Sequence, residues 1–294
     1  MTGTDQATEA FVAHRNLLFT VAYELLGSAA DAEDVLQETW LKWVGVDLES
    51  VRDHRAYLVR IASRQALSRL RTLGRRKESY VGPWLPEPLL TAPDVAEDVE
   101  LADSVSMAMM LVLETLKPTE RAVFVLREVF GLEYDEIAEA VDKKPGAVRQ
   151  IAHRAREHVA ARRPRGVVSA GETRDAIEAF QRAITTGDLQ NLVDVLAPDV
   201  VFLADGGGVV QAVLEPIVGA DRVATFLSRG RGRFVDTPVH LVQINGQPAL
   251  RIGFEGGGDT VMALRVEGGL IKGMYVVRNP EKLSRLDEEI TLSR

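Results

Sequence analysis

The chain has 294 residues, of which 46% are hydrophobic and 27% charged, and its formal net charge is −8 at pH 7. These values are typical of a globular protein with two or three domains. The absence of cysteine excludes disulfides and thiolate metal sites, and the five histidines show no metal-ligand spacing. No apolar run reaches membrane length and no targeting leader is legible. We therefore expect a cytoplasmic protein with no membrane contact, no metal and no cofactor.

Two amphipathic helices are predicted at the start of the chain, over residues 8–26 and residues 31–44, with Gly27 and Ser28 between them. The second helix has a mostly acidic stripe that core packing does not require. The stripe and the aromatic residue beside it are Asp34, Gln37, Glu38 and Trp40. The stripe is either a solvated helix face or a surface for a protein partner.

The charge reverses in residues 52–77, where Asp53 is the one acidic residue. Tyr57 and Leu58 belong to an apolar face that predicts a third helix. The arginines of this segment suit contact with nucleic-acid phosphates. Those we single out are Arg52, Arg55, Arg60, Arg64 and Arg71.

An acidic, proline-containing segment follows at residues 79–104, with no basic residue in it. Its proline density forbids a helix interior around residues 83–88 and favours extended chain. Trp84, Leu85 and Leu89 are too apolar for a purely solvated linker. We expect these three side chains to dock elsewhere in the protein.

Residues 105–165 predict a helix-turn-helix domain. A helix over residues 103–116 leads into helices over 119–129 and 133–141, and Pro145 suits the first position of the last helix. Glu133 and Lys144 stand where a Ser or Thr N-cap is usual, so both helix starts should be weak. The last helix has a basic outer face, as expected for a DNA-reading helix, although a solvated face is the alternative. The residues assigned to DNA are Lys143, Lys144, Arg149, Gln150, His153, Arg154 and Arg156.

The chain changes character after a second linker at residues 166–172. Amphipathic helices begin the segment 173–294, and strand patterns follow at residues 200–203, 239–244, 249–254, 261–266 and 271–277. Asn245-Gly246 is a strong signal for a two-residue hairpin, and Gly268-Gly269 marks another turn. Helices followed by a mostly antiparallel sheet predict an α+β domain with a concave sheet.

The first 165 residues resemble a sigma factor of the extracytoplasmic-function group. DAEDVLQETWLKW (31–43) is similar to the helix that binds the polymerase clamp, RAYLVRIASRQALSRLR (55–71) to the helix that meets the −10 element, and LKPTERAVFVLREVFGLEYDEIAEAV with GAVRQIAHRARE (116–157) to the domain that reads the −35 element. The resemblance implies two all-α domains, residues 1–78 and 105–165, which bind core RNA polymerase and promoter DNA. It also implies that the acidic stripe binds polymerase, that the arginines of residues 52–71 bind the −10 element and that the helix-turn-helix residues bind the −35 element. The loop at residues 45–54 becomes the candidate for holding an unstacked base.

The rest of the chain resembles a SnoaL-like domain, a cone-shaped α+β fold that extends one subgroup of these sigma factors. Three short motifs of that subgroup are legible, at residues 84–89, 205–208 and 279–283. The resemblance implies control of the sigma domains within the same chain, so that no separate anti-sigma factor is required. We expect a regulatory contact between the motifs, formed by Trp84, Leu85, Pro86, Asp205, Gly206, Gly207, Gly208, Asn279 and Pro280.

Two other functions remain open at this point. An enzyme would need a carboxylate–arginine set for acid–base work, for which the candidates are Asp205, Asp221, Arg222, Arg251 and Asp259. No spacing forces these residues together, and residues 206–208 are better explained by a sharp bend or a close chain approach. A ligand-controlled repressor would use the helix-turn-helix and an unknown small molecule in the C-terminal domain, but it leaves the acidic stripe and the first basic helix without a role.

Overall fold

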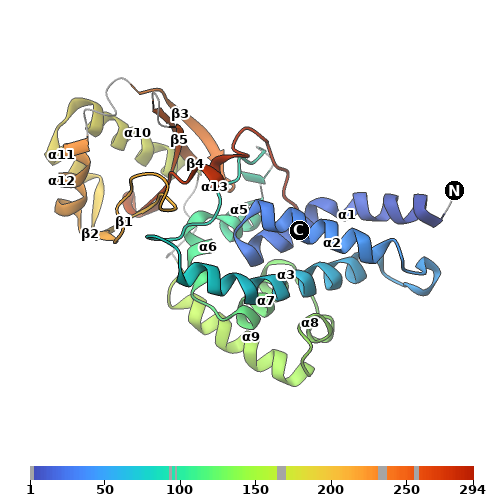
Figure 1. Ribbon diagram of the computed structural model, residues 1–294. Coiled ribbons are helices and arrows are strands. Elements are labelled where there is room, and N and C mark those ends of the chain that lie inside the picture. The colour runs from blue at the N-terminus through green and yellow to red at the C-terminus, as the bar shows by residue number, and fades with distance from the viewer. Residues whose placement is uncertain (1–2, 93–94, 97, 164–169, 231–236, 255–257) are drawn as a thin grey trace. The chain divides into compact units, whose positions relative to one another are not determined.

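The computed structural model describes residues 3–92, 95–96, 98–163, 170–230, 237–254 and 258–294 (Figure 1). The expected linker at residues 166–172 lies mostly outside these ranges. The chain forms two compact units. The helical unit comprises Met1–Glu78, Met110–Arg163 and Thr291–Arg294, and the sheet unit comprises Ser79–Met109 and Pro164–Ile290. The acidic, proline-containing segment is therefore part of the sheet unit and is not a free tether.

Three long helices open the helical unit: α1 (Gly3–Leu26), α2 (Ala29–Trp43) and α3 (His54–Glu78), with a short 3-10 turn, η1 (Leu48–Ser50), before α3. They pack against one another and are drawn in blue to teal in Figure 1. The Ser28 side chain caps α2 by accepting a hydrogen bond from the Asp31 N–H. The indole of Trp43 is fully buried and donates to the carbonyl of Ala7, 2.8 Å away, which fixes α2 against α1.

The rest of the helical unit contains α7 (Pro118–Phe124), a π-helical turn η2 (Val125–Val129), α8 (Tyr134–Val141) and α9 (Pro145–Ala160). The predicted turn between α8 and α9 is present, and Asp142 ends α8 with a left-handed φ of 55°. The start of α8 is better supported than predicted, because the Glu136 carboxylate accepts the Glu133 N–H at 2.8 Å.

The helix predicted over residues 103–116 is two helices, α5 (Val99–Val105) and α6 (Met107–Glu114). Ser106 interrupts them because its ψ of 147° is extended. Its hydroxyl accepts the Met109 N–H, which supports the start of α6. The boundary between the two units falls inside α6.

The sheet unit has a six-stranded open sheet in the order β2-β1-β6-β5-β4-β3. The strands are β1 (Leu196–Asp205), β2 (Ile217–Val218), β3 (Val239–Ile244), β4 (Gln247–Phe254), β5 (Gly258–Glu267) and β6 (Leu270–Val277). Neighbours are antiparallel except β1 and β6, which are parallel. The hairpin predicted at Asn245-Gly246 is confirmed, since both residues have positive φ, 53° and 70°.

Helices α10 (Ala170–Thr186), α11 (Leu189–Asp194) and α12 (Ala220–Gly230) supply apolar side chains to one face of the sheet. Phe180 and Leu227 pack there with alternate residues of the strands, such as Leu250, Met262 and Met274. The sequence pattern did not predict β2, α12 or the short α13 (Pro280–Leu283). Among the described residues no helix is long and apolar enough to cross a membrane.

Candidate functional site

A buried carboxylate joins the three short motifs of the sheet unit. Asp205, at the end of β1, has no exposed surface. Its Oδ1 accepts hydrogen bonds from the Tyr80 hydroxyl (2.6 Å) and the Gly207 N–H (3.0 Å), and its Oδ2 accepts the Leu85 N–H (2.9 Å). The Nζ of Lys282, in α13, lies 2.7 Å from the same Oδ2. We call these residues, with Trp84 and Asn279, the Asp205 junction.

Lys282 is enclosed by groups that suit a cation. Its Nζ lies 4.2 Å from the centroid of the Trp84 ring and 4.9 Å from that of Tyr80, and it donates to the Leu85 carbonyl. The Lys282 side chain is only 12% exposed. Trp84 is half-buried and Leu85 fully buried, so the expected docking of this apolar segment occurs, and it occurs on the sheet unit.

Asn279 and Tyr80 complete the junction. Asn279 is buried; its Nδ2 donates to the Tyr80 hydroxyl at 2.8 Å, and its Oδ1 caps α13 by accepting the Glu281 N–H. Burial, with the hydrogen bond to Asp205 as the next cause, raises the pKa of Tyr80 well above its usual value. Tyr80 therefore stays protonated and donates to Asp205 across the physiological pH range.

The glycines after Asp205 are required by close approach, as the sequence analysis favoured. A Cβ on Gly206 would lie 2.1 Å from the Val210 carbonyl oxygen, and one on Gly207 would lie 2.4 Å from the Asn279 Nδ2. Gly207 and Gly208 also have positive φ, 62° and 74°. A Cβ on Gly208 would lie 3.1 Å from the Cβ of Val81, at the start of the docked segment.

The docked segment also forms an isolated β-bridge to the end of β3, between Leu90 and Ile244. The Asn245 N–H donates to the Leu89 carbonyl, the Thr91 N–H donates to the Gln243 carbonyl, and the Ile290 N–H donates to the Leu90 carbonyl. The buried Asn245 side chain accepts the Leu89 N–H at 2.9 Å and donates to the Val105 carbonyl at 2.8 Å. Pro86 is buried in the same stretch, and Pro280 occupies the first turn of α13.

The helix-turn-helix surface has the character expected from the sequence. All seven residues assigned to DNA on α9 and the turn before it are exposed, while Val148, Ala152, Ala155 and Val159 are buried. Arg149 lies 5.6 Å from the centroid of the Tyr134 ring, and Arg156 pairs with Glu128 at 3.3 Å. Of the other five assigned residues, all exposed, His153 lies with its Nε2 3.6 Å from the Glu157 carboxylate.

The arginines assigned to the −10 element fall into two groups. Arg52, Arg55 and Arg71 are exposed. Arg60, which is half-buried, contacts the carboxylate of Glu139 in α8, and Arg64, which is exposed, contacts the carbonyl of the same residue. A cleft of about 290 Å³ lies between the start of α3 and α8. It is lined by residues 50–53, 56, 57 and 60 on one side and by Leu132, Glu136 and Glu139 on the other.

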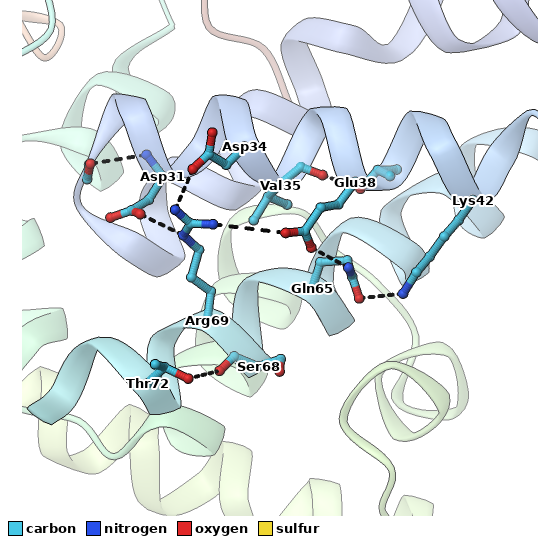
Figure 2. A network of polar contacts seen from close by, with 11 residues as sticks. Asp31, Asp34, Val35, Glu38, Lys42, Gln65, Ser68, Arg69 and Thr72 are labelled. Carbon is cyan, nitrogen blue, oxygen red and sulfur yellow. Dashed lines mark hydrogen bonds and ion pairs between the residues drawn. The ribbon is translucent and has the colours of Figure 1, made fainter.

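The acidic stripe of α2 is engaged by α3 (Figure 2). Arg69 reaches across to Asp31 at 2.6 Å and to Asp34 at 2.5 Å, and lies 4.0 Å from Glu38. Gln65 bridges Glu38 and Lys42. Asp34, Gln37 and Glu38 nevertheless remain exposed, and the ring of Trp40 is half-buried against Phe11. The stripe is thus an exposed surface whose carboxylates are contacted by Arg69 and Gln65 of α3.

The carboxylate–arginine set that an enzyme would need is not assembled. Arg251 of β4 pairs with Asp259 of β5 and with Asp287, whereas Asp205 belongs to the junction. Asp221 and Arg222 line a third place, a cleft of about 380 Å³ beside α12. Within the described ranges no cluster of three or more His, Cys, Asp or Glu could hold a metal ion.

Sequence reasoning missed four residues of these sites: Tyr80, Lys282, Arg69 and Glu139. Tyr80 precedes the motif at residues 84–89 and Lys282 belongs to the motif at residues 279–283, so their nearness to the motifs was the available signal. Arg69 and Glu139 make contacts between helices distant in sequence, which no spacing pattern predicts.

Two family models match the chain: Sigma-70 region 2 at residues 10–76 and Sigma-70, region 4 at residues 106–159. The chain is 33% identical over 292 residues to the ECF RNA polymerase sigma factor SigJ of Mycobacterium tuberculosis strain H37Rv, covering 93% of this chain and 92% of that protein. It is 32% identical to the probable ECF RNA polymerase sigma factor SigI of the CDC 1551 strain, covering 99% of both.

The crystal structure of M. tuberculosis SigJ matches this structure with a TM-score of 0.78 at 31% identity, covering 95% of this chain and 99% of that one. The match confirms the fold class, two helical domains followed by an α+β sheet domain. Region 2 spans the acidic stripe and the basic α3, and region 4 spans the helix-turn-helix. The chain belongs to the extracytoplasmic-function RNA polymerase sigma factors.

Proposed function

We propose that this sigma factor directs core RNA polymerase to specific promoters and that the Asp205 junction controls its activity within the chain. The buried Asp205 carboxylate carries the proposal, because a fully buried charge is stable only when it is paired and hydrogen-bonded. Two of its donors, the Tyr80 hydroxyl and the Leu85 N–H, come from the segment that joins sigma region 2 to region 4.

Docking of this segment restricts the sigma regions. About thirty flexible residues would let their ends separate by roughly 30 Å on average. The segment is instead fixed to the sheet unit at Asp205 and again at β3. Sigma regions 2 and 4 consequently have fewer relative arrangements in the free protein. Polymerase must bind one of these arrangements or release the segment from the sheet unit.

Core polymerase binds the α2 stripe and Trp40. The −10 element binds the arginines of residues 52–71, and the −35 element binds α9 and the turn before it. Since the Asp205 junction belongs to the same chain as the sigma regions, its effective concentration near them is high and no separate anti-sigma factor is required. The protein works in the cytoplasm as a transcription factor and not as an enzyme.

Run-off transcription with core polymerase tests the control. Trp84→Ala and Asp205→Ala should change transcript yield at least about twofold, since the first removes the aromatic ring over the Lys282 ammonium and the second leaves that buried ammonium without its carboxylate. Phe226→Ala is the matched control, because Phe226 is a large residue of the sheet unit, 38% exposed, on α12. If both junction variants transcribe like the unmodified chain, control by this junction is excluded.

A further inference from the structure

The helix α8 presents an acidic surface with no basic residue of its own. Its sequence is YDEIAEAV, and Asp135, Glu136 and Glu139 are exposed. Glu139 lies in the last turn, where helix carbonyls lack intrahelical partners and carry the negative end of the dipole. The carboxylate and the carbonyl of Glu139 are therefore two adjacent acceptors on one residue.

Both acceptors of Glu139 are occupied by arginines of α3. Arg60 Nη1 pairs with the carboxylate, and its guanidinium also lies 4.5 Å from the centroid of the Tyr57 ring. Arg64 donates to the carbonyl from Nε at 3.1 Å and from Nη2 at 2.6 Å. Guanidinium groups make the same fork-like contacts with phosphate oxygens.

We infer that Glu139 is a built-in competitor of promoter DNA for Arg60 and Arg64. The inference rests on the proposed role of these two arginines at the −10 element. An arginine that donates to Glu139 cannot donate to a phosphate at the same time, so DNA must displace α8 from α3. The −35-reading domain thereby covers part of the −10-reading helix in the free protein.

The cleft beside this contact fits the same explanation. Its one wall is the end of the 45–54 loop and the start of α3, where an unstacked base is expected, and its other wall includes Glu136 and Glu139. Two carboxylates facing that loop repel a phosphate backbone. Separation of α8 from α3 removes both carboxylates and exposes both arginines in one movement.

The ion pair between Arg60 and Glu139 is weak enough for DNA to displace it. The Arg60 side chain is 32% exposed and that of Glu139 is 60% exposed. Exposed ion pairs of this kind are worth little because water and salt screen them. Loss of the Glu139 charge should accordingly raise DNA affinity by a small factor, about two- to fivefold.

Fluorescence anisotropy of the full chain with a labelled dT20 single strand tests this inference. Glu139→Gln should bind about two- to fivefold more tightly than the unmodified chain at low salt. Asp135→Asn is the matched control, because it removes the same charge from an exposed position of the same helix, α8. Adding Arg60→Gln to Glu139→Gln should abolish the gain.

Each outcome decides one point. If Glu139→Gln binds no more tightly than Asp135→Asn, while Arg60→Gln weakens binding in the Glu139→Gln background, Glu139 is not a competitor and the role of Arg60 in DNA binding stands. If Arg60→Gln has no effect in the Glu139→Gln background, the −10 assignment of Arg60 is itself wrong, and the inference falls with it.

Discussion

The ammonium of Lys282 lies 2.7 Å from the carboxylate of Asp205, with side chains 12% and 0% exposed respectively. Removal of one partner from a buried ion pair leaves the other charge without compensation. Asp205→Asn and Lys282→Met should therefore each lower the free energy of unfolding, by about 3–5 kcal/mol. Denaturant unfolding of the full chain measures both effects.

The double variant is the control for this pair. Since it leaves no isolated charge, it should be less destabilised than the sum of the two single variants. Simple additivity would contradict the coupling of Asp205 and Lys282.

Gly207 and Gly268 allow a matched comparison of backbone and steric cost. Their φ angles are similar, 62° and 58°, but a Cβ on Gly268 has nothing within 4 Å, whereas one on Gly207 would lie 2.4 Å from Asn279. Gly268→Ala should cost about 1–2 kcal/mol from the left-handed backbone alone. Gly207→Ala should cost clearly more and should also weaken the hydrogen bond from Asn279 to Tyr80. Equal melting temperatures for the two variants would exclude the steric contribution.

Local patterns predicted most elements of this fold. The five predicted strands are present, with ends shifted by a few residues, because alternation and the glycine turns define them locally. The two-residue strand β2 has too few residues to show alternation. In α12, glycine and charged residues surround a short apolar face. The break at Ser106 between α5 and α6 is likewise invisible in the apolar spacing.

The candidate sites were predicted unevenly for a related reason. Exposed residues of α9 follow from helical periodicity alone. The short motifs were recognised, but their mutual contact depends on β1, the docked segment and α13 meeting at Asp205. The engagement of Arg60 and Arg64 by Glu139 joins residues more than seventy positions apart, and such a contact is set by packing and not by spacing.

The raised pKa of Tyr80 predicts that the stability of the sheet unit against unfolding depends on pH. A tyrosine gains its charge on losing a proton, and burial of Tyr80 beside Asp205 disfavours that charge in the folded state. Because the folded pKa lies above the unfolded value of about 10, the stabilising contribution is complete below about pH 10 and is lost as the pH rises further. Thermal unfolding of the unmodified chain and of Tyr80→Phe should differ clearly at pH 8 and less at pH 11. A difference that stays constant over this interval would contradict the assignment.

Substitutions of two arginines in α9 should have different effects on DNA binding. Arg149 lies early in α9, where side chains reach base edges in helix-turn-helix domains. Arg149→Ala should weaken binding at one promoter position by about 1–3 kcal/mol, whereas Arg156→Ala should weaken all sequences alike and reduce the salt dependence. Band-shift titrations against single-base promoter variants separate the two patterns. Sequence-independent losses from both variants would refute the direct reading by Arg149.

The acidic stripe of α2 gives the last prediction. Asp34 and Glu38 are 51% and 48% exposed, and Arg69 also contacts Asp31, which the double variant retains (Figure 2). Exposed pairs contribute at most about 1 kcal/mol each, so Asp34→Ala/Glu38→Ala should fold normally. Its affinity for core polymerase should fall about tenfold, which corresponds to about 1.4 kcal/mol.

Arg69→Gln is the control for the polymerase interface, since it breaks the network between α2 and α3 but retains both carboxylates. If polymerase binds the carboxylates themselves, this variant should keep its affinity for core polymerase; a pull-down titration with core polymerase measures the affinity of both variants. Loss of affinity in Arg69→Gln with none in Asp34→Ala/Glu38→Ala would show that the shape of α2, and not its charge, is what polymerase binds. Unchanged affinity in both variants would place the interface elsewhere on the helical unit.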